Sequence, residues 1–370
     1  MVRYSFILPC QNEEKTVGKV IDGIHEVMAG KEYEIILSDS STDHSRMIAE
    51  QKGAKVIHHG KKGYGTAIRE GVAVSTGEIL VIGDADDTYD FREIPLLLSQ
   101  IEAAGLVIGS RYKGVIQKGA MPLHHRYIGN PLISRMIRFF FRCSVTDALS
   151  GLRVIKKSTL ESLGLTTNGM EYASEMVIKA CKKKMRIIEV PITYHKRVGR
   201  SKTRSLGDGW KHLRFIMLYS PLFLFFVPGI FLFSLGSFLL LLLRRGPVDL
   251  IWVHLDIHPL ILGALLTILG FQIIILGIFA KTFAVTQLGE KDRFISFLHS
   301  HLSLERGLLI GLFITLLGIL INVRIFVIWA AGGFGSLYQT RNAVVAMTII
   351  VIGITALFST FFLSLLGIKR

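Results

Sequence analysis

The stretch Glu78-Ile79-Leu80-Val81-Ile82-Gly83-Asp84-Ala85-Asp86-Asp87 decides the fold class. Its four consecutive large apolar residues indicate a buried strand, and three aspartates follow directly after it. Carboxylates crowded at a strand end raise one another's pKa unless a cation neutralises them. Oxygen ligands at this spacing suit Mg²⁺ or Mn²⁺ that also binds substrate phosphates. We therefore expect a nucleotide–metal site at Asp84 and Asp86.

Short apolar runs alternate with helical stretches on both sides of this strand. Strands are expected at 4–8, 34–37, 55–57, 79–82 and 106–108, and helices at 13–28, 43–51, 65–74 and 92–104. Such alternation predicts an α/β domain with a parallel sheet covered by helices on both faces. Ligands bind beyond the carboxyl ends of the strands in such sheets, so the residues after each strand are candidate site residues.

Polar residues follow three further expected strands. Asp39 comes after the second strand, where a carboxylate can accept hydrogen bonds from a nucleotide base or ribose. The basic, glycine-rich turn 61–65 precedes a helix, and its N–H groups and lysines suit a diphosphate. The segment 9–14 follows the first strand and carries acidic residues into the next helix. Each signal taken alone is equally consistent with helix capping or a solvated turn.

The C-terminal part of the chain has a different composition. The whole chain is 50% hydrophobic and 19% charged with a net charge of +15, which excludes disorder, collagen and coiled coil. Residues 221–370 carry only 10 basic and 5 acidic residues among long apolar runs. A helix needs about 20 apolar residues to cross a bilayer. We therefore predict four transmembrane helices, at about 222–243, 259–280, 307–331 and 343–368.

Basic residues in the flanks of these spans predict the orientation of the chain. The 281–306 loop and the C-terminus are rich in Lys and Arg, which favours a cytoplasmic position for them and for the large N-terminal domain. No signal peptide is expected before the first strand. Three widely spaced cysteines indicate neither a disulfide framework nor a zinc site, as suits a reducing cytoplasm. The expected location is the cell (plasma) membrane, with several spans.

The ordered set of motifs resembles family-2 glycosyltransferases of GT-A fold, and in particular polyprenyl-phosphate glycosyltransferases such as dolichol-phosphate mannose and glucose synthases. The similarity covers about residues 1–220. The motifs that carry it are Leu8-Pro9 with Asn12-Glu13-Glu14, Asp39, Lys62-Gly63, Asp84-Ala85-Asp86, Gly109–Tyr112, Asp147–Arg153, Glu171 with Glu175, and Gly199–Lys202. The implied architecture is a GT-A (Rossmann-like) catalytic domain at 1–200, an interfacial amphipathic helix at 201–220 and a transmembrane domain at 221–370.

The resemblance implies roles for the donor side of the site. Asp84 should face the donor sugar or ribose, and Asp86 should bind Mg²⁺ or Mn²⁺. The mannose synthases have a Gln two residues later as a further ligand, whereas this sequence has Thr88, with Asp87 and Asp90 nearby. The donor-binding residues implied by the family are Pro9, Gln11, Glu13, Asp39, Lys62, Gly63, Asp84, Ala85, Asp86, Arg200 and Lys202.

The resemblance also implies how the acceptor is held. Arg111 and Arg126 match arginines that bind the lipid phosphate, and Ser134 or Arg135 on the following helix should assist them. No single-residue base is implied, because a phosphate monoester is largely ionised at pH 7, with a second pKa of about 6. Asp147 is either an extra carboxylate near the acceptor or an anchor for Arg126.

The stretch between the two domains is strongly basic. Lys182 to Arg214 contains 11 basic residues and two acidic ones. Trp210, Leu213 and Met217 recur at helical spacing, which predicts an amphipathic helix on an anionic membrane surface. An ordinary solvated helix is the alternative. No nucleic-acid-binding motif accompanies the charge.

The function implied is transfer of a hexose, with inversion, from a nucleotide sugar to dolichyl or polyprenyl phosphate at the cytoplasmic leaflet. UDP-glucose, UDP-N-acetylglucosamine and GDP-mannose are the donor candidates, and Thr88 in place of Gln weakens the case for the last. A processive polysaccharide synthase is one alternative, although its Gln-x-x-Arg-Trp motif is absent. A lipid-sugar transporter is another, but Arg324 is the sole charge well inside a predicted span.

Overall fold

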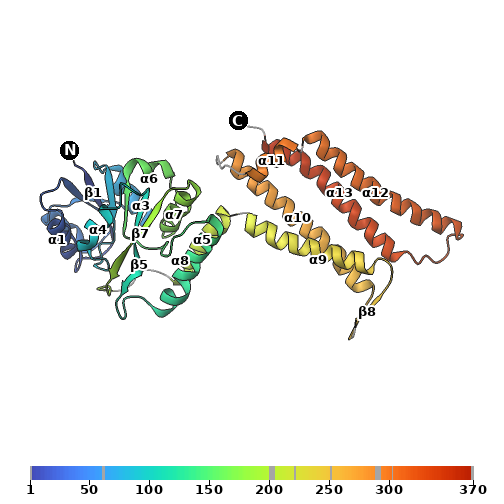
Figure 1. Cartoon of the computed structure of the whole chain (residues 1–370), viewed down its shortest axis with the longest axis horizontal. Coiled ribbons are helices and arrows are strands. Elements are labelled where there is room, and N and C mark those ends of the chain that lie inside the picture. Colours follow the sequence, from blue (N-terminus) through green and yellow to red (C-terminus); the bar gives the residue numbers. More distant parts are fainter. Residues whose placement is uncertain are drawn as a thin grey trace. The chain divides into compact units, whose positions relative to one another are not determined.

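The computed structural model describes residues 2–60, 63–199, 205–220, 222–250, 252–287, 293–301 and 303–367. The chain divides into two compact units, Met1–Leu218 and Tyr219–Arg370. The first contains a sheet flanked by helices, and the second consists mainly of long helices (Figure 1).

A seven-stranded sheet forms the centre of the first unit. Strands β1, β2, β3 and β4 are parallel neighbours, as the alternation of strands and helices predicts. Strand β6 lies antiparallel between β4 and β5, so the expectation of a fully parallel sheet is wrong. The order is β3 (Lys55–His58), β2 (Tyr33–Asp39), β1 (Tyr4–Cys10), β4 (Ile79–Ile82), β6 (Arg153–Lys156), β5 (Leu106–Ile116) and β7 (Ile187–Tyr194).

Strands β6 and β7 were not predicted. Strand β6 has four residues, begins with a fully buried arginine and therefore lacks a clear apolar run. Strand β7 contains Pro191 and charged Glu189, and both weaken a strand pattern. Their positions in the sheet depend on pairing with β5, which is distant in sequence. Sequence periodicity alone does not reveal such pairings.

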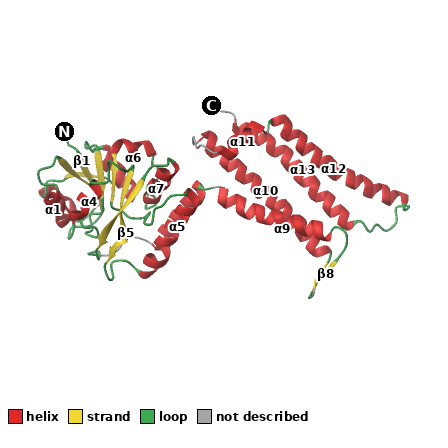
Figure 2. Ribbon diagram, viewed as in Figure 1, coloured by secondary structure: helices red, strands yellow, loops and turns green. Residues whose placement is uncertain are grey.

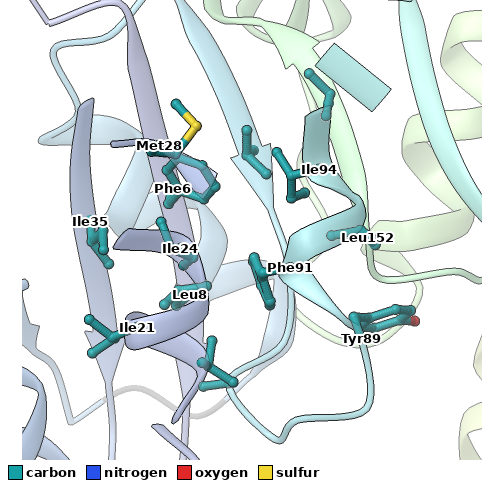
Figure 3. Close-up of a cluster of buried hydrophobic side chains, with 14 of the residues drawn as sticks. Phe6, Leu8, Ile21, Ile24, Met28, Ile35, Tyr89, Phe91, Ile94 and Leu152 are labelled. Carbon is teal, nitrogen blue, oxygen red and sulfur yellow. The ribbon is translucent and has the colours of Figure 1, made fainter. Parts of the chain in front are cut away.

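Helices cover both faces of this sheet. Alternate residues of β1 face opposite ways, so Phe6 and Leu8 pack in the cluster with Ile21 and Ile24 of α1 (Val17–Val27; Figure 3). Ile7 faces the other side, toward α3 (Tyr64–Ala73), where Gly71 allows close contact. The remaining helical elements of this unit are α2 (Ser45–Gln51), η1 (Phe91–Glu93), α4 (Ile94–Leu98), η2 (His125–Gly129), α5 (Asn130–Phe141), α6 (Lys157–Leu163), α7 (Tyr172–Lys182) and α8 (Ser205–Tyr219).

Helix α8 contains the predicted amphipathic segment. Its buried side chains are His212, Phe215 and Ile216, and His212 contacts Ser174 of α7 at 2.9 Å. Trp210 lies on a different side and is 58% exposed. The helix therefore packs on the first unit by one face and leaves the predicted tryptophan available to another environment.

The second unit has four helices that are long and apolar enough to cross a membrane (Figure 2). They are Phe223–Leu243, Ile257–Thr286, Leu304–Ala331 and Thr340–Gly367, close to the four predicted spans. The unit comprises η3 (Leu222–Phe226), α9 (Val227–Leu243), the hairpin β8 (Val248–Leu250) and β9 (Val253–Leu255), α10 (Ile257–Gln287), α11 (Arg293–His301), α12 (Leu304–Ala331) and α13 (Thr340–Gly367).

Two predicted loops of this unit contain regular structure. Much of the 281–306 loop is helical, because α10 continues past Lys281 and α11 follows it. A lysine ends an uncharged run without ending a helix, since its propensity for helix is high. The loop after the first span includes the β8–β9 hairpin.

Glycines set the distance between helices α9 and α10. A Cβ added to Gly236 would lie 2.6 Å from the carbonyl oxygen of Gly263 and would also overlap the backbone nitrogen of Thr267. Gly270 and Gly229 meet in the same interface. Small residues let backbones approach closely where lipid leaves no hydrophobic drive for helix association.

We predict that Gly236→Ala lowers the thermal stability of the full-length protein in detergent. The added methyl must separate α9 from α10, and overpacking costs roughly 1–3 kcal/mol, more than the helix propensity gained by alanine. Gly246→Ala is the control, because a Cβ there has no neighbour within 4 Å. A melting temperature for Gly236→Ala equal to that of the control would contradict this account.

Candidate active site

The parallel strands bring the predicted donor residues to one edge of the sheet. Cys10 at the end of β1 pairs with Asp39 at the end of β2, and β4 pairs with β1 on its other side. The segment after β1 is tied to the segment after β2 by hydrogen bonds. Asn12 N–H donates to Ser41 Oγ at 2.7 Å, and Glu13 N–H donates to Ser45 Oγ at 2.8 Å. Pro9, Gln11 and Glu13 therefore lie on a braced backbone next to Asp39.

Asp39 is fully buried at this edge. Its Oδ1 accepts a hydrogen bond from Ser41 N–H at 3.2 Å. His58 Nδ1 lies 3.4 Å from its Oδ2, and Arg46 Nε lies 3.7 Å from the same oxygen. The buried Arg46 Nε has no hydrogen-bond partner within the described ranges, so this corner retains an unused donor beside an acidic group.

Asp86 has both carboxylate oxygens engaged. Its Oδ1 accepts hydrogen bonds from Thr88 N–H at 3.1 Å and Thr88 Oγ1 at 2.5 Å. Its Oδ2 lies 2.7 Å from Nη1 of Arg197, whose Nη2 contacts Glu13. Thr88, which stands where the mannose synthases have Gln, thus orients the aspartate. Ala85, between the two aspartates, is buried and accepts a hydrogen bond on its carbonyl from Thr16 Oγ1.

Asp84 differs from an ordinary aspartate in its protonation. Burial first, and then the neighbouring Asp86 carboxylate, raise the pKa of Asp84 from 3.8 to about 7, although Arg197 and Arg111 act in the opposite direction. A Cβ added to Gly151 would lie 2.7 Å from Asp84 Oδ2, so this glycine lets the backbone approach the carboxylate. Gly151 N–H donates to Tyr89 Oη at 2.7 Å.

The other two aspartates near this strand face away from the pair. Asp87 has a left-handed backbone, with φ of 61°, and its carboxylate contacts Lys19 of α1 at 2.5 Å. Asp90 accepts hydrogen bonds from the backbone and side chain of Arg92 and begins η1. Neither side chain is directed to Asp84 and Asp86 as a further metal ligand.

Arg111 and Asp147 form a buried bidentate pair. Arg111 Nε and Nη2 donate to the two oxygens of Asp147 at 2.8 and 2.7 Å, and Arg111 N–H donates at 2.9 Å. The guanidinium also lies 5.2 Å from the centre of the Tyr194 ring. Asp147 therefore anchors Arg111, and the alternative that it anchors Arg126 is wrong. Asp147 and Arg111 meet because β6, which follows Asp147, runs antiparallel beside β5, which carries Arg111.

Arg126 and Ser134 lie in different surroundings. Arg126 is in η2, is partly exposed and stacks near the ring of Tyr127 at 5.5 Å. Ser134 is buried in α5, and its Oγ accepts a hydrogen bond from Ala148 N–H at 3.2 Å. Arg135, one residue further, is exposed. Helix α5 thus connects the Arg126 segment to the loop that carries Asp147.

Four predicted donor residues belong to the glycine-rich turn and to a later loop. Gly63 precedes α3 with φ of 140°, and a side chain there would overlap Asn168 O. Lys62, Arg200 and Lys202 lie outside the described residues, as does the rest of the 200–204 segment. Their assignment to the donor remains a prediction.

The oxygen atoms at this edge fit the coordination of a divalent cation. Asp84 and Asp86 supply carboxylate oxygens, and the guanidinium of Arg197 already lies against Asp86 and Glu13 as a positive group. Within the described ranges no three His, Cys, Asp or Glu side chains form a complete metal cage. Mg²⁺ is commonly bound by one or two carboxylates plus substrate phosphates, so two aspartates are sufficient.

Sequence reasoning did not find Arg197. It lies in a stretch with many basic residues, and nothing in its spacing distinguishes it from Lys196 or Arg200. Its proximity to Asp86 arises because β7 ends beside the β4 loop, where His195 N–H donates to Thr88 O at 2.8 Å. Thr88 was noted only as a missing glutamine, although its hydroxyl and N–H hold Asp86 in place.

Comparison with known proteins identifies relatives for both units. Residues 5–164 match Glycosyl transferase family 2, and residues 278–367 match the glycosyltransferase family 2 C-terminal transmembrane region. The low-salt glycan biosynthesis hexosyltransferase Agl6 of Haloferax volcanii is 36% identical over 98% of this chain and 89% of its own length. A dolichyl-phosphate hexose transferase of the same organism is 31% identical over 56% of this chain and 92% of its own.

A solved structure is similar at lower identity. Glucosyl-3-phosphoglycerate synthase from Mycobacterium tuberculosis, in complex with Mn²⁺, UDP and glucosyl-3-phosphoglycerate, is 23% identical. The similarity covers 59% of this chain and 78% of that chain, with a TM-score of 0.47.

We predict that Asp84→Asn raises the melting temperature more at pH 8 than at pH 4.5, in EDTA. Between pH 3.8 and about 7 the unfolded chain ionises Asp84 while the folded chain keeps the proton, so folding loses stability as pH rises. The asparagine removes this loss of stability. The melting temperature should rise by about 2–4 °C for each kcal/mol regained.

Asp90→Asn is the control of opposite sign. Burial is the largest single effect and raises the pKa of Asp90, but the hydrogen bonds and charge of Arg92 together outweigh it, so the pKa is lowered. Its replacement should therefore lower the melting temperature at pH 8. Equal shifts for Asp84→Asn at the two pH values would contradict a raised pKa for that residue.

Proposed function

Because the chain belongs to glycosyltransferase family 2 and is a membrane hexosyltransferase, we propose that it transfers a hexose from a nucleotide sugar to a polyprenyl phosphate. The observation that carries this proposal is the grouping of a carboxylate pair and an arginine at one edge of the sheet. The two are joined by one loop, since Asp147 binds Arg111 and Gly151, four residues later, lies against the Asp84 carboxylate. A donor diphosphate needs a divalent cation, which carboxylates can hold, and an acceptor phosphate needs a cationic side chain such as arginine.

The donor would bind along the ends of β1, β2 and β4. Asp39 is the group proposed for the nucleoside, with Pro9, Gln11 and Glu13 beside it, and Gly63 begins the turn proposed for the diphosphate. Lys62, Arg200 and Lys202 complete this proposal. Hydrogen bonds from backbone N–H groups to side chains join the 10–13 and 39–45 segments. They support the proposal, since they hold that edge in place before any ligand arrives.

Asp84 and Asp86 would hold Mg²⁺ or Mn²⁺, which neutralises the charge of a departing nucleoside diphosphate. Thr88 would keep Asp86 in position through its two hydrogen bonds. The solved Mn²⁺ and UDP complex of glucosyl-3-phosphoglycerate synthase concerns a distant protein and lends no residue assignment. The support comes from the acidic pair itself.

The acceptor phosphate would lie between Arg111 and Arg126. Asp147 fixes the position of Arg111, and Ser134 connects α5 to the same loop. The phosphate needs no base, because its oxygen is already largely ionised near pH 7. That oxygen would bond to the anomeric carbon as the bond to the diphosphate breaks, which inverts the configuration. The two arginines would hold the phosphate in line for this single displacement.

The surface around Arg126 is suited to a lipid. Exposed apolar side chains lie along the segment 123–139 that contains it, and exposed Arg135 and Arg138 lie on the same segment. Isolated exposed apolar residues are ordinary, but several on one segment mixed with arginines match an anionic membrane surface. The set comprises Leu123, Tyr127, Ile128, Leu132 and Phe139.

We further propose that the catalytic unit is cytoplasmic and that the chain resides in the plasma membrane, from the basic flanks of the spans. The transporter alternative gains no support. Arg324, seven residues before the end of α12, is exposed on that helix and so can extend its charge toward the membrane surface.

A panel of labelled UDP-glucose, UDP-N-acetylglucosamine and GDP-mannose, offered with polyprenyl phosphate, tests the reaction. One donor should yield an organic-extractable product with the full-length protein in detergent, where no compartment exists for transport. Excess EDTA, or Asp86→Ala, should reduce the rate by orders of magnitude because the leaving group is then unneutralised. Full activity in EDTA would exclude the metal, and absence of product with every donor would exclude the proposed reaction.

Replacement of Arg126 tests the acceptor assignment. Charge-assisted hydrogen bonds contribute roughly 1.5–3 kcal/mol each, so Arg126→Ala should raise the KM for polyprenyl phosphate about 10–100-fold and leave the donor KM nearly constant. Arg126 is a better probe than Arg111, whose removal would also leave Asp147 buried without its partner.

Arg3→Ala is the matched control, since Arg3 is an exposed arginine that lies 5.5 Å from the ring of the adjacent Tyr4, as Arg126 does from Tyr127, but precedes β1 at the opposite end from the site. A rise confined to the donor KM in Arg126→Ala, or an equal acceptor effect in Arg3→Ala, would refute the assignment.

A further inference from the structure

Arg197 contacts two carboxylates at the edge of the sheet that carries Asp84 and Asp86. Its Nη1 is 2.7 Å from Asp86 Oδ2, and its Nη2 contacts Glu13 Oε1. The arginine side chain is 22% exposed, whereas the two carboxylate side chains are 8% and 9% exposed. One guanidinium therefore contacts two largely buried carboxylates, which come from the ends of β4 and β1, and offsets part of their charge.

Hydrogen bonding leaves Asp86 little free capacity. A carboxylate oxygen offers two lone pairs, and Thr88 uses both of those on Oδ1 through its N–H and its hydroxyl. Arg197 uses one lone pair of Oδ2. A divalent cation that binds Asp86 must therefore use the same oxygen as the guanidinium, and two cations on one oxygen repel each other.

We propose that Arg197 is an exchangeable cation that occupies the metal position until a divalent ion displaces it from Asp86. The proposal rests on the proposed metal role of Asp84 and Asp86, and it adds an intramolecular competitor for that site. The guanidinium offsets part of the negative charge of this edge while no metal is bound, and an entering metal must displace its contact with Asp86. Arg197 is thus a residue that sets metal affinity without being a ligand.

The contacts of Arg197 are suited to exchange. Its Nε is buried and has no hydrogen-bond partner in the part of the chain that the structure describes, so the guanidinium is incompletely satisfied where it lies. An unsatisfied buried donor costs free energy, which reduces the barrier to leaving. Arg111 differs, because its backbone N–H, Nε and Nη2 all bind Asp147 and its side chain is only 7% exposed.

The test measures Mn²⁺ binding to the full-length protein in detergent, without nucleotide, by loss of the free-ion EPR signal. Arg197→Gln should bind Mn²⁺ about tenfold more tightly than the wild type, since no charged contact has to be broken. Arg197→Lys keeps the charge but loses the fork that reaches both carboxylates, so roughly threefold tighter binding is expected.

Lys19→Gln is the matched control. Lys19 also pairs with an aspartate of the β4 loop, Asp87, at 2.5 Å, but on the side away from Asp84 and Asp86. It removes the same unit of positive charge, so any general electrostatic gain appears in it equally. A melting curve like that of the wild type verifies that each variant is folded, and Arg197→Lys provides the result if Arg197→Gln is not.

Equal or weaker Mn²⁺ binding by folded Arg197→Gln would overturn the proposal and make Arg197 a structural clamp. An equal gain in Lys19→Gln would overturn it as well. If neither the wild type nor any variant bound Mn²⁺ even with UDP added, the proposed metal site itself would fail, and the exchange with it. If Arg197→Gln bound Mn²⁺ more tightly and the wild type transferred no hexose to polyprenyl phosphate, the exchange would stand and only the proposed acceptor would be refuted.

Discussion

Two carboxylates crowded at the end of β4 place the strongest constraint on the catalytic unit. Asp84 and Asp86 lie two residues apart at the end of a fully buried strand, where like charges destabilise each other. The structure lessens this cost in two ways. The pKa of Asp84 is raised to about 7, so its carboxyl keeps a proton below that pH, and the guanidinium of Arg197, just after β7, contacts Asp86. Much of the surrounding architecture provides those positive groups.

The antiparallel strand β6 supplies the opposite side of this edge. It returns the chain between β4 and β5, so that the loop before it brings Asp147 to Arg111 and Gly151 to Asp84. Arg153, at the start of β6, holds this loop from below. It is almost fully buried and donates to the carbonyls of Ser150, Ala148 and Ala173 at 2.7–2.8 Å. The position of Arg111 thus depends on backbone carbonyls as well as on Asp147.

The membrane unit follows a different physical rule. Its helices pack through glycines, as at Gly236 against Gly263 and at Gly311 against Leu357, because close backbone contact replaces hydrophobic burial in lipid. Polar side chains at these contacts bond within their own helix, as Thr267 does to Gly263 O. Such a unit presents apolar surfaces, whereas the charged side chains of the candidate site lie at the sheet edge of the first unit.

The sequence by itself determined the elements that local pattern controls. Four spans, the parallel strands β1 to β4 and the Asp84–Asp86 motif were all predictable, since uncharged length, alternation and strand-end chemistry depend on neighbouring residues. Only the tertiary structure decided which charges meet. The pairs Arg111–Asp147 and Arg197–Asp86 join residues 36 and 111 positions apart. Their partners are fixed by the placement of β6 and β7, and that placement depends on long-range strand pairing, which leaves no local pattern in the sequence.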